Sequence, residues 1–306
     1  MSDRVSCERA SCEPEDEEEL DERLPGTNQI IRGKEGAYSV GKIISRGRFG
    51  AIYEVLRKRD GRRFAAKLEV CDVHSHGIDM DYNVLKKLGK EEEAADYLPF
   101  LYDKGKIAEH FRFIVITLMG HDMLTLRTQY TEEGRFSLST ALRLALLTLH
   151  PIQFLHSKGY VHRDIKASNF VLSADGCAVC IIDFGLARHF RDREGEQKAP
   201  REIATFRGTT RYASISAHKN QEQSPKDDIE SWFYMVVEFV TGYLPWSHMH
   251  RREREEHEFR RMLKYIDSLG YDGQVDYTFL GQLVALSMRN HQVNVDDPFD
   301  WQEKDE

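Results

Sequence analysis

The chain has 306 residues, of which 41% are hydrophobic, and this is enough to bury a core as one large domain or as two lobes. Its net charge of −8 comes mostly from residues 1–24, which carry ten acidic and three basic side chains. Five cysteines without framework spacing argue against a secreted disulfide scaffold, and we find neither a signal peptide nor an apolar run long enough to cross a bilayer. We therefore expect a soluble protein without membrane insertion, cytoplasmic and with access to the nucleus.

Residues 1–35 are expected to form a disordered acidic extension. Its first part, "MSDRVSCERASCEPEDEEELDERLPG", has almost no aromatic or β-branched residues, so it cannot bury enough apolar surface to offset the entropy of ordering. This composition is typical of a solvating segment, and a charged interaction arm is the alternative.

Residues 36–119 are predicted to form a small lobe of strands with one helix. Five short segments rich in β-branched and aromatic residues predict the strands. These segments are 38–44, 51–58, 62–70, 100–108 and 111–119. Asp60 and Gly61 predict the turn between the second and third strands. Residues 79–88 have helical periodicity, with one face that is apolar apart from Asp81.

Residues 120–306 predict a larger and mainly helical lobe. Apolar residues recur with the period of a helix in 139–159, 227–242 and 277–290. The first helix contains Pro151, which should bend it or shift its boundary. The second should begin at an aspartate cap and lie in the middle of the core, because it is apolar nearly all round. The predicted class is α+β, and small-molecule sites are common where two such lobes meet.

The stretch "VHRDIKASNFVL", residues 161–172, places three polar side chains of complementary chemistry close together. Asp164 could accept a proton from a hydroxyl group. Lys166 could neutralise a phosphoryl group during its transfer, and Asn169 could supply a neutral oxygen to a metal ion.

Two further stretches carry groups that suit phosphate chemistry. The run "IIDFGLA" ends an apolar strand in Asp183, whose carboxylate is a hard oxygen ligand suited to Mg²⁺. In "FAAKLEV" the alternation of side chains puts Ala65 and Lys67 on one face of a strand. A lysine in that position could bind an anion.

Taken together, these segments resemble a eukaryotic protein kinase. The stretches "HRDIKASNF", "DFGLAR", "GTTRYASISAH", "DDIESWFYMVVEFVTGYLPW" and "FDW" make the chain similar to the casein kinase I group. Within that group it is most similar to the tau-tubulin kinase-like branch, including its divergent nematode members. The resemblance extends from about Gly36 to Trp301 and implies the two-lobed kinase fold, with a five-stranded first lobe that holds one helix.

The resemblance implies roles for individual side chains and names ATP and Mg²⁺ as cofactors. Asp164 would be the catalytic base and Lys166 the lysine that binds the γ-phosphate. Thr209 would bridge these two residues. Asn169 and Asp183 would be the Mg²⁺ ligands.

The resemblance also implies a nucleotide site. Lys67 would hold the α- and β-phosphates with Asp81 as its carboxylate partner, while Ile116 would be the gatekeeper and 117–119 the hinge. Asp228 would anchor the catalytic loop from the central helix. The residues expected to bind the nucleotide are Ser45, Gly47, Gly50, Ile52, Ala65, Lys67, Ile116, Thr117, Met119, Val171 and Asp183.

Four positions depart from the pattern of the family. Ser45 stands at the first glycine position of the phosphate loop, and Asp81 is one methylene shorter than the usual glutamate. Ala167 replaces the proline of the catalytic loop and Ser216 replaces an asparagine after the activation segment. A pseudokinase that binds nucleotide or partners without phosphotransfer is therefore the alternative, although the groups expected to touch phosphate and metal are all present.

Residues 188–211 would form the activation segment, which contains seven arginine or lysine residues and four acidic ones. In casein kinase I relatives a basic surface of this kind receives acidic or pre-phosphorylated substrates, and Arg201 is the position that matches best. A loop of mixed charge without this role is the alternative. We expect a monomer that acts on protein substrates and does not bind nucleic acid.

Overall fold

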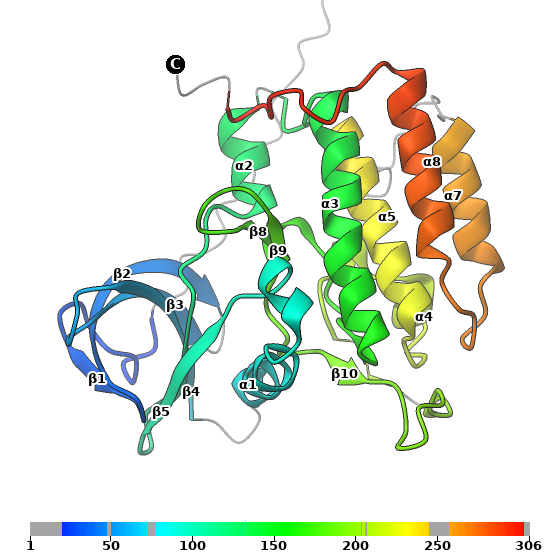
Figure 1. The fold of residues 1–306 in the computed structure, drawn as a ribbon. Coiled ribbons are helices and arrows are strands. Elements are labelled where there is room, and N and C mark those ends of the chain that lie inside the picture. Colours follow the sequence, from blue (N-terminus) through cyan, green and yellow to red (C-terminus); the bar gives the residue numbers. More distant parts are fainter. Residues whose placement is uncertain are drawn as a thin grey trace, which may run out of the picture. The chain divides into compact units, whose positions relative to one another are not determined.

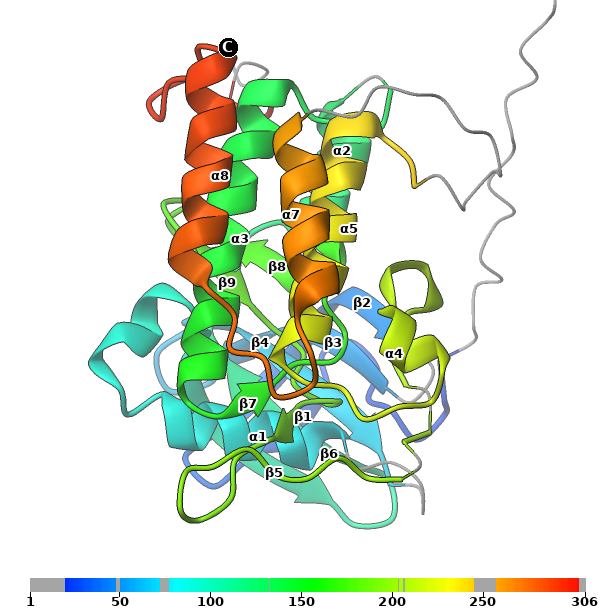
Figure 2. The ribbon, with the colours of Figure 1, turned by 90° about the vertical axis from the view of Figure 1, so that its right-hand side faces the viewer.

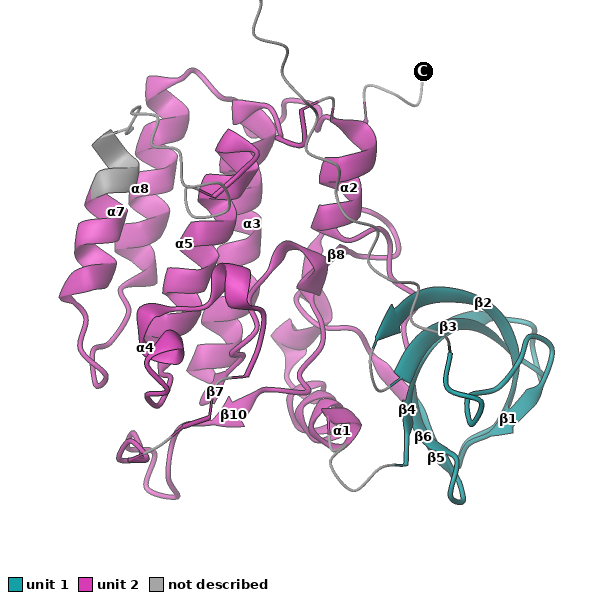
Figure 3. Ribbon diagram, turned by 180° about the vertical axis from the view of Figure 1, so that it is seen from behind, with its two compact units in different colours: residues 1–75, 103–115 teal, residues 76–102, 116–306 magenta. Residues whose placement is uncertain are grey.

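The computed structural model describes residues 20–47, 50–71, 77–131, 133–202, 204–205, 207–244 and 257–302, without the side chains of 257–260. The chain divides into two compact units, one made of residues 1–75 and 103–115 and the other of residues 76–102 and 116–306 (Figure 3). The predicted α+β class is confirmed, since strands dominate the first unit and helices the second.

In the described part of the chain six strands form the main sheet, one more than the sequence predicted. Several of them are labelled in Figure 1. The six strands are β1 (Ile30–Arg32), β2 (Ala37–Gly47), β3 (Gly50–Arg57), β4 (Arg63–Val70), β5 (Leu101–Ile107) and β6 (Phe111–Ile116). Their order in the sheet is β1-β2-β3-β4-β6-β5, and the first four pair as antiparallel neighbours. Gly61, with φ of 67°, lies in the predicted turn between β3 and β4.

The sheet buries one of its faces, as the alternation of side chains predicted. Tyr53, Val55, Phe64, Ala66 and Leu68 all point into one hydrophobic cluster because they sit at alternate positions of two neighbouring strands. The intervening side chains therefore belong to the opposite face.

The acidic extension does not remain disordered over all of its predicted length. Residues 1–19 lie outside the described part of the chain, but Leu20 and Leu24 pack against the core cluster of the sheet. Ile31 lies in strand β1 and is buried. The prediction was wrong for these later residues because it rested on the scarcity of aromatic and β-branched residues in residues 1–26, whereas a few apolar side chains are enough to attach the segment to the sheet.

The second unit contains the helices α1 (Gly77–Leu88), α2 (Met123–Tyr130), α3 (Leu138–Ser157), α4 (Ile215–His218), α5 (Pro225–Thr241), α7 (His257–Ser268) and α8 (Tyr277–Asn290). Its short strands are β7 (Tyr160–Val161), β8 (Phe170–Leu172), β9 (Val179–Ile181) and β10 (Arg188–His189), and its 3₁₀ turns are Glu92–Asp96, Ala167–Asn169 and Thr210–Tyr212. Helices α3, α5, α7 and α8 lie side by side (Figure 2). Helices α2, α4 and α7 and the short strands β7, β8 and β10 were not predicted, whereas β9 lies in the apolar strand that was predicted before Asp183.

Helix α3 runs through the helical unit and supports its core. Among the described helices it has the length and hydropathy of a membrane span, but 61% of the relevant window is buried within the protein. This burial is what a core helix requires. Thr148 on α3 accepts a hydrogen bond of 3.0 Å from Nε1 of Trp232 on α5, so the packing of the two helices includes a satisfied polar contact.

Two helix starts differ from the prediction. Helix α3 is capped by Ser137, and it continues through Pro151 instead of changing its boundary there. Helix α5 begins with a capping box in which Ser224 and Asp227 satisfy each other's backbone groups. At its other end Gly242, with φ of 81°, terminates the helix in the left-handed conformation, as its position had predicted.

Candidate active site

One buried carboxylate on α5 anchors the loop that carries Asp164. Asp228 accepts hydrogen bonds from the backbone N–H groups of His162 at 2.7 Å and Arg163 at 2.8 Å. Its Oδ2 atom also lies 2.8 Å from Nε2 of His156 on α3. Burial opposes ionisation of Asp228, but the interactions with His156 and His162 together outweigh it and hold the pKa of this carboxyl below its usual value. The loop backbone is therefore fixed by an ionised group in the core.

Replacing this anchor should destabilise the protein. Asp228→Ala leaves two buried N–H groups without their acceptor, so we expect the free energy of unfolding to fall by roughly 3 to 5 kcal/mol. Because the folded pKa lies below the unfolded one, this contribution is present above the usual pKa of an aspartate and is lost as the pH falls. Urea denaturation at pH 7 measures the change, with the exposed Asp272→Ala as control. A loss of less than about 1 kcal/mol would contradict the anchoring role.

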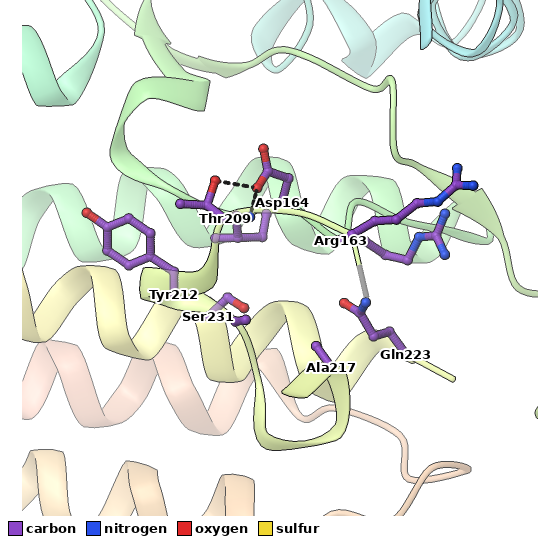
Figure 4. A pocket seen from close by; sticks show the side chains of 10 residues that line it. Arg163, Asp164, Thr209, Tyr212, Ala217, Gln223 and Ser231 are labelled. Carbon is purple, nitrogen blue, oxygen red and sulfur yellow. Dashed lines mark hydrogen bonds between the residues drawn. The ribbon is translucent and has the colours of Figure 1, made fainter. Parts of the chain in front are cut away.

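The carboxylate of Asp164 is held by groups on both of its oxygens. The backbone N–H and the hydroxyl of Thr209 each donate to Oδ1 at 2.8 Å (Figure 4). Lys166 Nζ lies 2.9 Å from Oδ2, and it donates to the Thr209 hydroxyl oxygen at 3.1 Å. The structure thus brings together Asp164, Lys166 and Thr209, although the threonine is 45 positions further along the chain.

Asn169 and Asp183 are brought together by the hairpin of strands β8 and β9. Phe170 pairs with Ile181 in this hairpin, and the Ile182 N–H donates to the carbonyl of Asn169 at 2.9 Å. Asp183 follows directly and has a left-handed φ of 67°, which turns the chain away from the strand. The hairpin therefore places these two side chains at one end of a short ribbon.

The donor atoms at this end fit a hard cation such as Mg²⁺. Asn169 Nδ2 donates to the main-chain carbonyl of Asp164 at 2.8 Å, so the amide presents its oxygen as a ligand, and Asp183 adds a carboxylate. Within the described ranges no group of three or more His, Cys, Asp or Glu side chains suits a metal ion. Two protein ligands agree with Mg²⁺ held mainly by water and phosphate oxygens.

On the first unit, three predicted nucleotide-binding positions form one row across neighbouring strands. Ser45 pairs with Ile52, and Ile52 pairs with Lys67. Directly opposed residues point to the same face of a sheet, and Ala65 shares that face because it is two residues from Lys67. This is the face opposite the hydrophobic cluster, as the alternation predicted.

The neighbouring strand leaves no room for a side chain at Gly50. Gly50 pairs with Gly47 where β2 turns into β3, and residues 48–49 between them lie outside the described part of the chain. A Cβ atom at Gly50 would lie 1.9 Å from the carbonyl oxygen of Leu68. Strand pairing alone therefore requires this glycine, whether or not it meets a phosphate.

The expected hinge lies between β6 and the approach to β8. Strand β6 ends at Ile116, followed directly by Thr117. Beyond Met119 the chain runs beside β8, because Leu172 forms two backbone hydrogen bonds of 2.9 and 3.0 Å with residues 120–121. Val171 on β8 is buried next to this segment.

Asp81 has a partner that the sequence analysis did not foresee. Its Oδ1 atom accepts a hydrogen bond of 2.7 Å from the backbone N–H of Phe184. The side chain is only 2% exposed and shares the buried face of α1 with Val84 and Leu88, as the helical spacing predicted. The carboxylate therefore holds the backbone next to Asp183. The predicted pairing of Asp81 with Lys67 stays a prediction.

Two buried glutamates hold the activation segment and were missed by the sequence analysis. Glu222 pairs with Arg201, whose Nη2 atom lies 3.1 Å from Oε1. Glu238 on α5 accepts hydrogen bonds from Arg211 and from the hydroxyl of Tyr212. These partners are 21 to 27 positions apart, so no local pattern could have predicted the pairs. The role of Arg201 in binding substrate anions stays a prediction.

A pocket opens beside the catalytic loop within the helical unit. Its lining includes Arg163, Asp164, Thr209, Tyr212 and Gln223 (Figure 4). Asp164 therefore lines the same pocket as residues of the activation segment and of the loop before α5.

Comparisons with known proteins agree with this geometry. The protein kinase domain model matches residues 38–283. The chain is 31% identical to the serine/threonine-protein kinase spe-6 of Caenorhabditis elegans, with 93% of this chain and 81% of that protein covered. It is also 31% identical to a probable casein kinase I homolog of Encephalitozoon cuniculi, with 84% and 91% covered.

Two further similarities are weaker, one in coverage and the other in sequence identity. The chain is 30% identical to a probable serine/threonine-protein kinase of Dictyostelium discoideum, and the match covers 87% of this chain but only 57% of that protein. The structure of vaccinia related kinase 3 superposes with a TM-score of 0.74 at 19% identity, covering 90% of this chain and 94% of the other. The second match supports the fold. The family match, together with the serine/threonine kinases among the relatives, shows that this chain belongs to the eukaryotic protein kinase family and carries a serine/threonine protein kinase domain.

Proposed function

We propose that this protein is an active serine/threonine kinase that transfers the γ-phosphate of ATP, with Mg²⁺, to hydroxyl groups of protein substrates. The observation that carries the proposal is the arrangement around Asp164, whose two carboxylate oxygens are bound by Thr209 and Lys166. Such a network fixes a carboxylate at the place where a general base is needed and puts one ammonium group beside it.

The chemistry asked of these side chains is mainly positioning and charge stabilisation. Thr209 donates twice to Oδ1 of Asp164. Oδ2, which has Lys166 and the amide of Asn169 beside it, would orient the substrate hydroxyl and take its proton. Lys166, 2.9 Å from Oδ2, stabilises the negative charge that develops beside it. Asn169 and Asp183 would hold Mg²⁺, which neutralises phosphate charge when it is bound.

We further propose that the protein belongs with the casein kinase I group and its tau-tubulin kinase-like branch. The motifs after the catalytic loop and the casein kinase I homolog among the relatives support this placement. By analogy, acidic or phosphorylated residues near the target serine would be preferred, because the activation segment is rich in arginine.

Acidic peptides should outperform neutral ones as substrates. We expect kcat/KM to be several-fold higher for a serine peptide with aspartate or phosphoserine on its N-terminal side than for its alanine counterpart, as attraction to exposed arginines predicts. The gap should narrow as ionic strength rises, because exposed charges are screened. Steady-state kinetics between low and physiological salt measures this, and equal values at low salt would defeat the preference.

A pseudokinase is the alternative, and Ser45 and Asp81 are the observations that favour it. The two functions are separated by incubating the purified protein with ATP labelled at the γ-phosphate and with casein. Label transferred to casein or to the protein itself, but not by Asp164→Asn, supports the kinase. Nucleotide binding without any transfer would support the pseudokinase.

A further inference from the structure

Glu222 is the centre of a charge cluster that the mechanism above does not use. It lies in the loop between α4 and α5, and only 2% of its side chain is exposed. Arg201 forms two hydrogen bonds with this carboxylate, and Nε of Arg188 lies 3.5 Å from Oε1. The charge of a third arginine, Arg163, also acts on Glu222. One buried carboxylate thus binds two guanidinium groups and is stabilised by the charge of a third.

The three arginines come from segments that meet at the catalytic loop. Arg163 directly precedes Asp164, and its Nε donates to the carbonyl of Leu186 at 2.7 Å. Arg188 lies in β10, which pairs with β7 just before the loop. Arg201 comes from the later part of the activation segment. Glu222 therefore connects the beginning of that segment to its later part, and its charge also acts on the loop that carries the catalytic base.

The cluster needs a negative charge. Burial lowers the pKa of Arg163 to about 10, and among the charges that act on it Glu222 gives the largest stabilisation of the guanidinium. Burial alone would raise the pKa of Glu222, but the hydrogen bond from Arg201 and the charges of the arginines hold it below its usual value. The glutamate is therefore ionised. Without it, Arg163 would be a buried cation next to two others, which is unfavourable.

In many kinases the negative charge at such an arginine cluster is a phosphate added to the activation loop. This chain has no serine, threonine or tyrosine between Phe184 and Ala204. The part of the segment that carries Arg188 and Arg201 therefore cannot acquire a phosphate on a hydroxyl group. A carboxylate from the neighbouring loop already stands in the centre of the cluster.

We infer that Glu222 is a positioning residue that supplies this negative charge permanently, so that the catalytic loop is ordered without phosphorylation of the activation segment. The inference rests on the proposed kinase function. It predicts that a phosphatase-treated wild-type protein keeps its kcat within about twofold. A large loss of kcat after phosphatase treatment would overturn it.

Replacement of Glu222 gives the sharper test. Glu222→Ala and Glu222→Gln should each lower kcat toward casein at least about tenfold, with the KM for ATP within about threefold, because the loop is misplaced while the nucleotide site is not. Glu202→Gln is the matched control, since it removes an exposed acid next to Arg201 and should leave kcat unchanged. If both Glu222 variants keep kcat within about threefold of the wild type, the inference is wrong.

Sulfate distinguishes lost charge from lost packing. In Glu222→Ala the three arginines face an opened space, and an oxyanion is the ligand that guanidinium groups bind best. Sulfate at millimolar concentration should therefore restore kcat of Glu222→Ala several-fold and raise its melting temperature in a saturable way. Glu222→Gln, whose amide still fills the space, should respond little, as should the double variant that also carries Arg201→Ala.

Two further outcomes would each be decisive. A folded but inactive Glu222→Ala that sulfate neither reactivates nor stabilises would overturn the inference. A wild-type protein that transfers no phosphate would overturn the proposed function, and the melting temperature of Glu222→Ala would then decide alone: saturable stabilisation by sulfate supports the charge-neutralising role, and its absence refutes it.

Discussion

Asp164→Asn is expected to lower kcat by a factor of about 10² to 10⁴, which corresponds to roughly 3 to 5 kcal/mol of activation free energy. The asparagine keeps an oxygen that can accept the 2.8 Å hydrogen bonds from Thr209, so the loop geometry should survive. It cannot take a proton from the substrate hydroxyl, and it no longer attracts Lys166. The loss should therefore appear in kcat, while the KM for ATP stays nearly constant.

Transfer of γ-phosphate to casein measures this effect, and the melting temperature shows whether the fold is kept. Asp267→Asn on α7 makes the same chemical change at an exposed position and serves as the control, with activity equal to the wild type. An Asp164→Asn protein whose kcat is within about threefold of the wild type would show that the catalytic base has been misassigned.

The second large effect is expected at Asp81. Asp81→Ala removes the acceptor of the 2.7 Å hydrogen bond from the Phe184 N–H and also the charge expected to interact with Lys67. We expect kcat/KM to fall at least about tenfold, or roughly 1.4 kcal/mol. Asp81→Glu keeps the charge and should preserve or raise the activity, provided that the buried site admits one more methylene.

Asp81→Asn separates the two contributions. Its amide oxygen can still accept from Phe184, but it carries no charge, so kcat/KM should fall between those of the wild type and Asp81→Ala. Asp79→Ala, in the first turn of the same helix and exposed, is the control. If Asp81→Asn equals Asp81→Ala, the bond to Phe184 contributes nothing. If it equals the wild type, the charge is irrelevant and Lys67 has another partner.

The sequence by itself determined those features that depend on neighbours along the chain. Alternation predicted that Lys67 and Ala65 share a face opposite the hydrophobic cluster, because successive residues of a strand point to opposite sides. Helical spacing placed Asp81 on the buried face of α1. Asp164, Lys166 and Asn169 lie within six positions of one another, so the composition of one loop was enough to predict a phosphate chemistry there.

Sequence periodicity was less reliable at the edges of elements. The short strand β1 escaped prediction because three residues carry almost no periodic signal. The start of α5 was misplaced because Asp227 and Asp228 both look like caps, whereas the structure uses Ser224 as the cap and keeps Asp228 for the catalytic loop. When several residues near a helix start could form the cap, the one that does so depends on which of them are bound elsewhere in the folded protein.

Only the tertiary structure decided the contacts between residues far apart in the chain. That Asp81 meets the backbone of Phe184 and that Glu222 binds Arg188 and Arg201 are pairings over 21 to 103 positions. The contact of Thr209 with Asp164 spans 45 positions and was implied by the family resemblance, not by any local pattern. The sequence gives the charge and the length of a side chain, but it does not give the residue that the side chain contacts. Burial then makes the partner matter, because a charge that is removed from water must be matched by another group in the folded protein.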